Sequence, residues 1–189
     1  GAGKLQVDDS AGPGELVKGT FASGLDARVE SAGGELNVVI KPANAFFPEM
    51  MFPWNWPGRE GLRWNFGLSP EIPLDLTFET GAAEADLDLR GLQVKDLLLK
   101  TGASATKIRM PAGAGQTFAR LEAGAASVKV SIPDNVSARI ETEGGLASIE
   151  VDEHRFVRQG EAYQSPDYEQ AEHRLDLRVE TGLGSIVIA

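Results

Sequence analysis

Apolar and polar residues alternate along most of the second half of the chain, in short runs that end near a glycine. In residues 74–78 and 85–89, apolar side chains occupy every second position and acidic residues or threonine stand between them. Alternation with a period of two is the pattern of a β-strand that has one buried and one solvated face. Since no helix-period stretch competes with this pattern, the sequence predicts an all-β fold.

These runs recur at a nearly constant interval. A short strand is followed by glycine at positions 81, 102, 124 and 145, in steps of 21, 22 and 21 residues, and again at position 182 after a step of 37. A second alternating strand follows each glycine. A repeat of this length is too short for a βαβ unit, which needs roughly 30 residues. The sequence therefore predicts a single-domain parallel β-helix (β-solenoid) with coils of about 21 residues, in which each strand pairs with its counterpart in the next coil.

The same alignment predicts a core, a set of corners and columns of outward charges. We expect a positive φ at the marker glycines, because a sharp corner between strands commonly requires it. Asp86, Lys107, Lys129 and Glu150 should lie on successive rungs. The flanking run around Trp64 and Phe66 also alternates. Besides these two aromatics, the predicted buried residues are Leu74, Leu76, Phe78, Leu87, Leu89, Leu97, Leu99, Ile108, Met110, Leu121, Val128, Val130, Ile132, Ile140, Ile149, Val151, Leu175, Leu177, Val179, Ile186 and Ile188.

Two segments break the repeat within a predicted single domain at 15–189. We expect residues 1–14 to be disordered or foreign to the natural chain. A charged insertion at 153–173 accounts for the longer step before Gly182 and should form a long hairpin or an extended loop.

The other insertion, at 43–61, is rich in aromatic residues, Met and Pro. One interpretation is a loop that caps an open end or a flank of the solenoid. The alternative is a hydrophobic docking site for a partner, because loops on a rigid scaffold collect binding residues and Trp and Met serve as anchors. The candidate partner-binding residues are Phe46, Phe47, Met50, Met51, Phe52, Trp54 and Trp56.

Composition and charge narrow the function classes. The net charge of −10 disfavours nucleic acid as a partner, because a phosphate backbone repels an acidic body. The chain has no cysteine, and its two histidines, His154 and His173, are 19 residues apart, which matches no metal motif. No cofactor or metal site is therefore predicted. Nucleotide-binding and catalytic motifs are also missing, so the sequence favours a protein that is not an enzyme.

Three stretches resemble the toast-rack domain of bacterial cell-wall-active antibiotic response proteins of the Lia type and of related adhesin-like proteins. They are Ile72–Ala82 (IPLDLTFETGA), Leu97–Ala103 (LLLKTGA) and Val179–Ile188 (VETGLGSIVI), and residues 15–41 are similar to the N-terminal part of that domain. The resemblance implies a module of the cell envelope that acts in stress sensing through contacts with another envelope or membrane protein. It carries no catalytic residue and leaves the side of the membrane open.

The sequence contains no run of about 20 apolar residues that would span a bilayer, so we expect any membrane segment to lie elsewhere in the full-length protein. Two further hypotheses stay open. One is an adhesin-like surface module that binds glycan or another surface. The other is a glycan-active enzyme, which would need two carboxylates facing each other across a deep groove.

Overall fold

The computed structural model describes residues 3–21, 25–32, 35–42 and 63–189, and within them almost all regular structure is β. The predicted all-β fold is confirmed. The strands are β1 (Gly3–Asp8), β2 (Val17–Phe21), β3 (Leu25–Ala32), β4 (Glu35–Pro42), β5 (Arg63–Leu68), β6 (Pro73–Thr80), β7 (Ala83–Asp88), β8 (Gln93–Thr101), β9 (Ala105–Arg109), β10 (Gln116–Ser131), β11 (Ser137–Gly144), β12 (Ser148–Val151), β13 (Val157–Gln159), β14 (Ala162–Gln164) and β15 (Arg174–Ile188), with one short 3-10 helix, η3 (Tyr168–Gln170).

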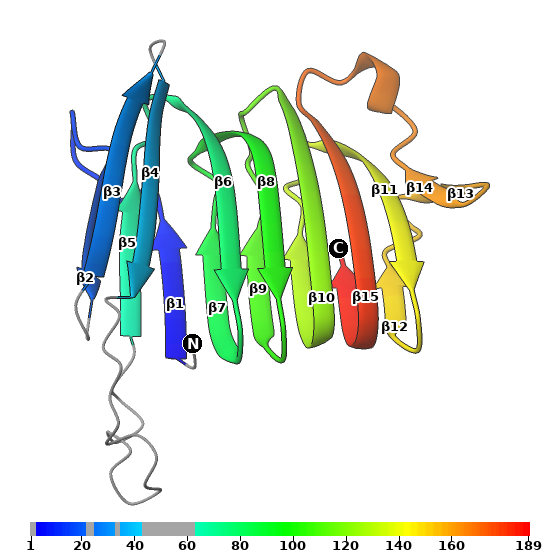
Figure 1. The fold of residues 1–189 in the computed structure, drawn as a ribbon. Helices are drawn as coiled ribbons and strands as arrows, with labels where there is room; N and C mark the ends of the chain where they lie inside the picture. The colour runs from blue at the N-terminus through cyan, green and yellow to red at the C-terminus, as the bar shows by residue number, and fades with distance from the viewer. Residues whose placement is uncertain (1–2, 22–24, 33–34, 43–62) are drawn as a thin grey trace, which may run out of the picture.

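The main body consists of two layers of parallel strands that face each other across the core (Figure 1). The front layer contains β6, β8, the first half of β10, the first half of β15, and β11, in that order. The rear layer contains β5, β1, β7, β9, the second halves of β10 and β15, and β12. The long strands β10 and β15 belong to both layers. In β10 the buried positions change phase at the exposed pair Gly124 and Ala125, so both halves point their apolar side chains inward.

The repeats pair in parallel, but the sheet as a whole is mixed. Leu76 lies opposite Leu97, and Leu97 opposite Ala119, at separations of 21 and 22 residues. Antiparallel pairs occur between β2 and β5, between β11 and β14, between β13 and β14, and in the separate β3–β4 hairpin. A uniform parallel β-helix over the whole chain is therefore not confirmed.

The position of β15 is the main departure from a simple stack. This last strand lies between β10 and β11, which precede it in the sequence (Figure 1). As a consequence Val187 stands between Lys129 and Glu150, so the expectation that these two side chains lie on successive rungs is wrong. The pairs Asp86–Lys107 and Lys107–Lys129 do have the predicted neighbours.

The marker glycines form a column, but not for the predicted reason. In the described residues, positive φ values occur only at Gly14, Gly115, Gly160 and Gly184, so the expected left-handed corners at the markers are absent. A Cβ on Gly102 would instead lie 3.2 Å from the carbonyl oxygen of Gly81, and a Cβ on Gly124 would lie 3.2 Å from that of Gly102. Glycine is favoured at the markers because the backbone of the neighbouring repeat passes so close that a Cβ would push it away by a few tenths of an ångström.

The predicted core is largely confirmed. Of the predicted buried set, Leu76, Phe78, Ile149 and Trp64 are only partly buried, and they pack against the core, which includes the remaining members. Trp64 belongs to an aromatic cluster at one end of the body, where its ring lies edge-on to Phe21 with centroids 5.5 Å apart.

The two ends of the body differ in part from the expectation. Residues 3–8 form β1, which pairs with both β5 and β7, so the predicted disorder of the N-terminal segment is wrong there. The charged insertion does form a hairpin, β13–β14, and β14 extends the front layer by pairing with β11. The aromatic insertion at 43–61, with all seven candidate partner-binding residues, lies outside the described residues.

Candidate interaction surface

The outward side of the front layer, here called the front face, is a regular lattice of side chains. On each of the five strands the residues that alternate with the core point outward, and parallel pairing places them in columns across the strands. The front face consists of Asp75, Thr77 and Glu79 on β6; Asp96, Leu98 and Lys100 on β8; Phe118, Arg120 and Glu122 on β10; Asp176, Arg178 and Glu180 on β15; and Arg139, Glu141 and Glu143 on β11.

One groove follows the glycine column at the edge of this face. It has a volume of ≈ 860 Å³, and its lining includes the marker glycines, the threonines that precede them, and the charged column that contains Lys100 and Glu122. Since glycine has no side chain, a column of stacked glycines leaves a trough between its polar neighbours. Two of the threonines lie inside the corner and bond to each other, with the Thr80 hydroxyl donating to Thr101 at 3.0 Å.

A second groove, of ≈ 630 Å³, lies in the middle of the front face around Phe118. The Phe118 side chain is 52% exposed, although phenylalanine is usually buried. Its strand neighbours are Asp96 on β8 and Asp176 on β15, and the half-buried Leu98 also lines the groove. An exposed aromatic ring between carboxylates on a rigid sheet is a candidate anchor for a partner.

The sequence analysis did not single out Phe118. The sequence did contain an indication. Phe118 stands between Thr117 and Ala119, which are buried, at a position where the alternation predicts a solvent-exposed side chain.

Ion pairs tie the front face together across β8, β10 and β15. The Lys100 Nζ lies 3.2 Å from the Glu122 Oε2, and the Arg120 Nε lies 3.0 Å from the Glu122 Oε1. The Arg120 Nη2 reaches the Glu180 Oε1 at 3.1 Å, and the Arg178 Nε reaches the same oxygen at 3.0 Å. Exposed pairs of this kind add only about 0–1 kcal/mol each to stability. They connect the charged side chains that line the two grooves.

The sequence model for the N-terminal domain of toast_rack (DUF2154) matches residues 1–131, which is more than two thirds of the chain. The chain belongs to the toast-rack family. The resemblance noted in the sequence is thus confirmed by a match that includes β1 and the first three repeats.

The toast-rack chain also shares its fold with a solved structure. This is the 1.95 Å crystal structure of a putative cell adhesion protein from Clostridium sporogenes ATCC 15579, with a TM-score of 0.84. The similarity covers 99% of this chain and 87% of the other, at 19% sequence identity. Among the curated proteins none matches the toast-rack chain. Helices long and apolar enough to cross a membrane are absent from the described part of the chain.

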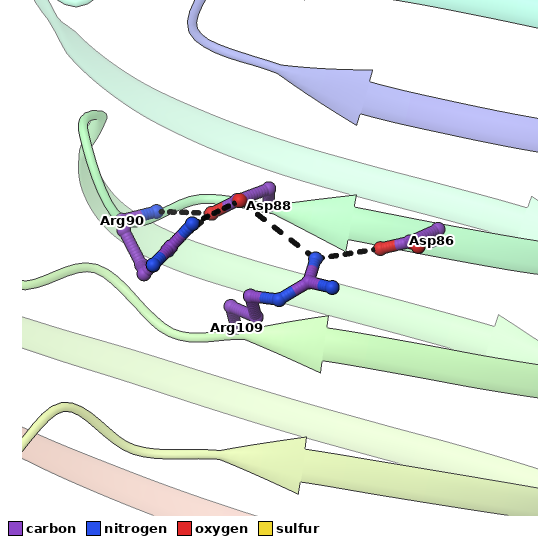
Figure 2. A network of polar contacts seen from close by, with 4 residues as sticks. All are labelled: Asp86, Asp88, Arg90 and Arg109. Carbon is purple, nitrogen blue, oxygen red and sulfur yellow. Dashed lines mark hydrogen bonds and ion pairs between the residues drawn. The ribbon is translucent and has the colours of Figure 1, made fainter.

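The rear layer of the toast-rack domain carries a second polar network, on β7 and β9 and the turn after β7 (Figure 2). The Arg109 Nη1 lies 2.8 Å from the Asp86 Oδ1 and 3.7 Å from the Asp88 Oδ2. Arg90 donates from Nε and Nη2 to the two oxygens of Asp88, at 2.8 and 2.6 Å. The hydrogen bond from the Arg90 side chain is the main reason why the pKa of Asp88 lies below its ordinary value.

Asp86 and Asp88 are the paired carboxylates that a glycan-active enzyme could in principle use for acid/base catalysis. Both carboxylates project from one face of one strand and bind arginines, so they do not face each other across a groove. A general acid needs a raised pKa, whereas the pKa of Asp88 is lowered. The arrangement is that of a structural ion-pair network.

The lowered pKa of Asp88 predicts a specific pH dependence of stability. Because the folded-state pKa lies below the unfolded value, the stabilisation is present above the unfolded pKa of about 3.9 and disappears as pH falls through the folded pKa. We expect Asp88→Asn to lower the free energy of unfolding by about 0.5 kcal/mol at pH 7 and by almost nothing at the acid end of the titration. Urea unfolding followed by circular dichroism at several pH values measures this difference.

The matched control is Asp134→Asn. The Asp134 side chain is fully exposed, and its oxygen lies as far as 3.8 Å from the Arg155 Nη1, so this ion pair is weak. The substitution should change stability little at any pH. A cost of Asp88→Asn that is the same at pH 7 and at the acid end would contradict an ionised, arginine-bound Asp88.

The two histidines, His154 and His173, lie in different connecting segments. In the described ranges no group of three His, Cys, Asp or Glu side chains is placed to hold a metal ion. His154 lies in the turn after β12, where its backbone amide donates to Asp152, and His173 precedes β15.

Proposed function

We propose that this toast-rack domain is a non-enzymatic interaction module of the bacterial cell envelope, belonging to a membrane-attached stress-response protein. In this proposal the repeats of residues 73–189 act as a short β-solenoid scaffold, and the front face binds the partner. The observation that carries the proposal is the half-exposed Phe118 at the centre of a groove on a rigid sheet. Family membership supports the envelope setting.

The chemistry of the front face suits recognition of a protein. Aromatic residues and arginines dominate the energetics of protein interfaces when polar neighbours surround them. Phe118 has this setting, with Arg120 and Arg178 in the same groove and carboxylates on its flanks. The partner we propose is another envelope or membrane protein. The net charge of −10 favours a partner with a basic surface over nucleic acid.

The aromatic insertion remains a second proposed contact. Phe52, Trp54 and Trp56 and their neighbours have the composition of a docking loop, and the competing proposal for this segment is a cap on the scaffold. The experiment below separates these two roles.

An adhesin-like surface module is the alternative, and the shared fold with a putative cell adhesion protein favours it. In that case the ligand would be a glycan or another surface, with a sugar ring stacked on Phe118 and its hydroxyls bound by Asp96 and Asp176. A glycan-active enzyme has the least support, because the acids considered for catalysis bind arginines.

Binding of the purified chain to two separate preparations tests the proposal. One is detergent-solubilised envelope protein and the other is protein-free cell-wall glycan. We expect saturable binding to the protein preparation, lost after protease treatment and weakened at least about tenfold by Phe118→Ser, since a buried aromatic anchor contributes about 2 kcal/mol or more. The matched control is Leu146→Ser, which removes an 88% exposed apolar side chain outside the front face.

The outcomes are distinct. If Phe118→Ser binds the protein preparation as well as the unmodified chain does, and the triple variant Phe52→Ser, Trp54→Ser and Trp56→Ser does not bind it, the binding site is the aromatic insertion and not the front face. Binding to the glycan alone would favour the adhesin, and product release from the glycan would establish an enzyme. No binding to either preparation would overturn the interaction module.

A further inference from the structure

We propose that the slot between β10 and the β11–β12 pair is a strand-binding site for β15 of a second copy of this chain, so that two copies assemble by exchanging their β15 strands. This inference goes beyond the proposed function and does not depend on it.

The topology creates the slot. β15 pairs with β10 along almost its whole length, from Gln116–Arg174 to Val130–Ile188, and on its other side with β11 and β12. β11 and β12 precede β15 in the sequence, yet β15 separates them from β10 (Figure 1). Until β15 inserts, β10 and the β11–β12 pair have unsatisfied parallel edges that face each other. Such edges bind any strand that fits them.

The slot is selective for the chain's own β15. In β15 the first half buries Leu175, Leu177 and Val179. The alternation then shifts by one residue, so that the second half again buries its apolar side chains, Ile186 and Ile188. Any other strand in the slot would need the same shift. An unrelated alternating strand would keep one phase and turn its second half outward.

Two glycines of β15 further restrict which strands can occupy the slot. A Cβ on Gly182 would lie 3.1 Å from the Gly124 carbonyl oxygen. Gly184 has φ +112°, and a Cβ there would collide with the Ala126 carbonyl, lying 2.9 Å from its carbon. A strand with a side chain at the Gly184 position would collide with the β10 backbone, so the expected occupant is β15 from another copy rather than a foreign segment.

The segment that leads into β15 favours opening. The His173 Nδ1 and the Arg174 Nε are buried and have no hydrogen-bond partner among the residues that the structure describes. Leaving such a group unsatisfied costs about 1–3 kcal/mol. An exchanged pair of copies would reproduce every contact of β15 with its slot and change only this connecting segment, and opening it breaks no hydrogen bond at the His173 Nδ1 or the Arg174 Nε.

Other contacts hold β15 in place once it has entered. The Asp176 carboxylate accepts hydrogen bonds from the Tyr168 hydroxyl at 2.7 Å and from the Gln116 Nε2 at 2.5 Å. The Arg174 amide donates to the Gly115 carbonyl at 2.7 Å. We therefore expect exchange to be slow at room temperature and to need partial opening.

Thiol cross-linking between two differently tagged variants of this chain tests the proposal, because its 189 residues contain no cysteine. Ser127 and Ser185 are neighbours on β10 and β15, with their Oγ atoms 3.2 Å apart on the exposed side. One variant carries Ser127→Cys and the other Ser185→Cys. Strand exchange holds the β10 thiol of one copy against the β15 thiol of the other, whereas unexchanged copies bring these exposed thiols together only by collision.

The mixture is warmed to just below the unfolding midpoint, cooled, oxidised and analysed on a non-reducing gel. We expect a covalent heterodimer at least about tenfold more abundant than in a control mixture of Ser127→Cys with Glu161→Cys, whose thiol would lie at the tip of the β13–β14 hairpin. The double variant Ser127→Cys, Ser185→Cys shows whether the two thiols react within one copy.

Efficient closure within the double variant, with no excess heterodimer in the mixture, would overturn the proposal. A second readout uses no thiols. The unmodified chain, treated in the same way at high concentration, should yield a dimer in size-exclusion chromatography that persists after dilution. A protein that remains monomeric there would overturn it as well.

Discussion

Replacing Gly184 by alanine should lower the free energy of unfolding by about 3 kcal/mol or more, or prevent folding altogether. Two costs combine at this position. The backbone has φ +112°, a conformation that L-residues rarely adopt, and the new methyl group would collide with the carbonyl group of Ala126 on β10. Relief requires β15 to move away from β10 at the corner, which disturbs both layers. Urea unfolding monitored by circular dichroism measures the loss.

Gly160→Ala is the matched control for this prediction. Gly160 also has a positive φ, +67°, but a Cβ there would meet nothing within 4 Å. Its replacement should cost about 1 kcal/mol, which is the conformational penalty alone. Equal losses in the two variants would mean that the contact with Ala126 contributes nothing.

Phe156→Ala should destabilise the protein by about 3–5 kcal/mol, the usual cost of removing a fully buried aromatic side chain. Phe156 is 0% exposed and belongs to the core, although it lies in the charged insertion between β12 and β13. Its amide donates to the Asp152 carbonyl at 3.0 Å, in the turn that follows β12. The midpoint and slope of urea unfolding measure the effect.

The control is Val157→Ala, one residue further along, where the side chain is 49% exposed. It should cost less than about 0.5 kcal/mol, as expected of a surface substitution. A loss below about 1 kcal/mol in Phe156→Ala would show that the end of the core does not depend on this ring.

The candidate interaction surface was only partly predictable. The sequence directed attention to the aromatic insertion, because unusual composition is visible without a structure. Phe118 is a single aromatic residue in the sequence. It becomes a candidate for binding only because parallel pairing places it between Asp96 and Asp176 at a groove. Phe156 was missed for the opposite reason, because its charged neighbours in the sequence conceal that the backbone turns it into the core.

The sequence by itself determined the strands of the repeats, their spacing and most of the core. A period of two assigns each side chain to one face of a strand, and that assignment is local, so Leu87, Ile108 and Val130 are buried as predicted. Only the tertiary structure decided which strands are neighbours. Hydrophobic alternation is the same for any parallel partner, so it does not reveal that β15 enters between β10 and β11. The marker glycines show the same division, since their spacing is visible in the sequence, but the close carbonyl that favours glycine belongs to a neighbouring repeat.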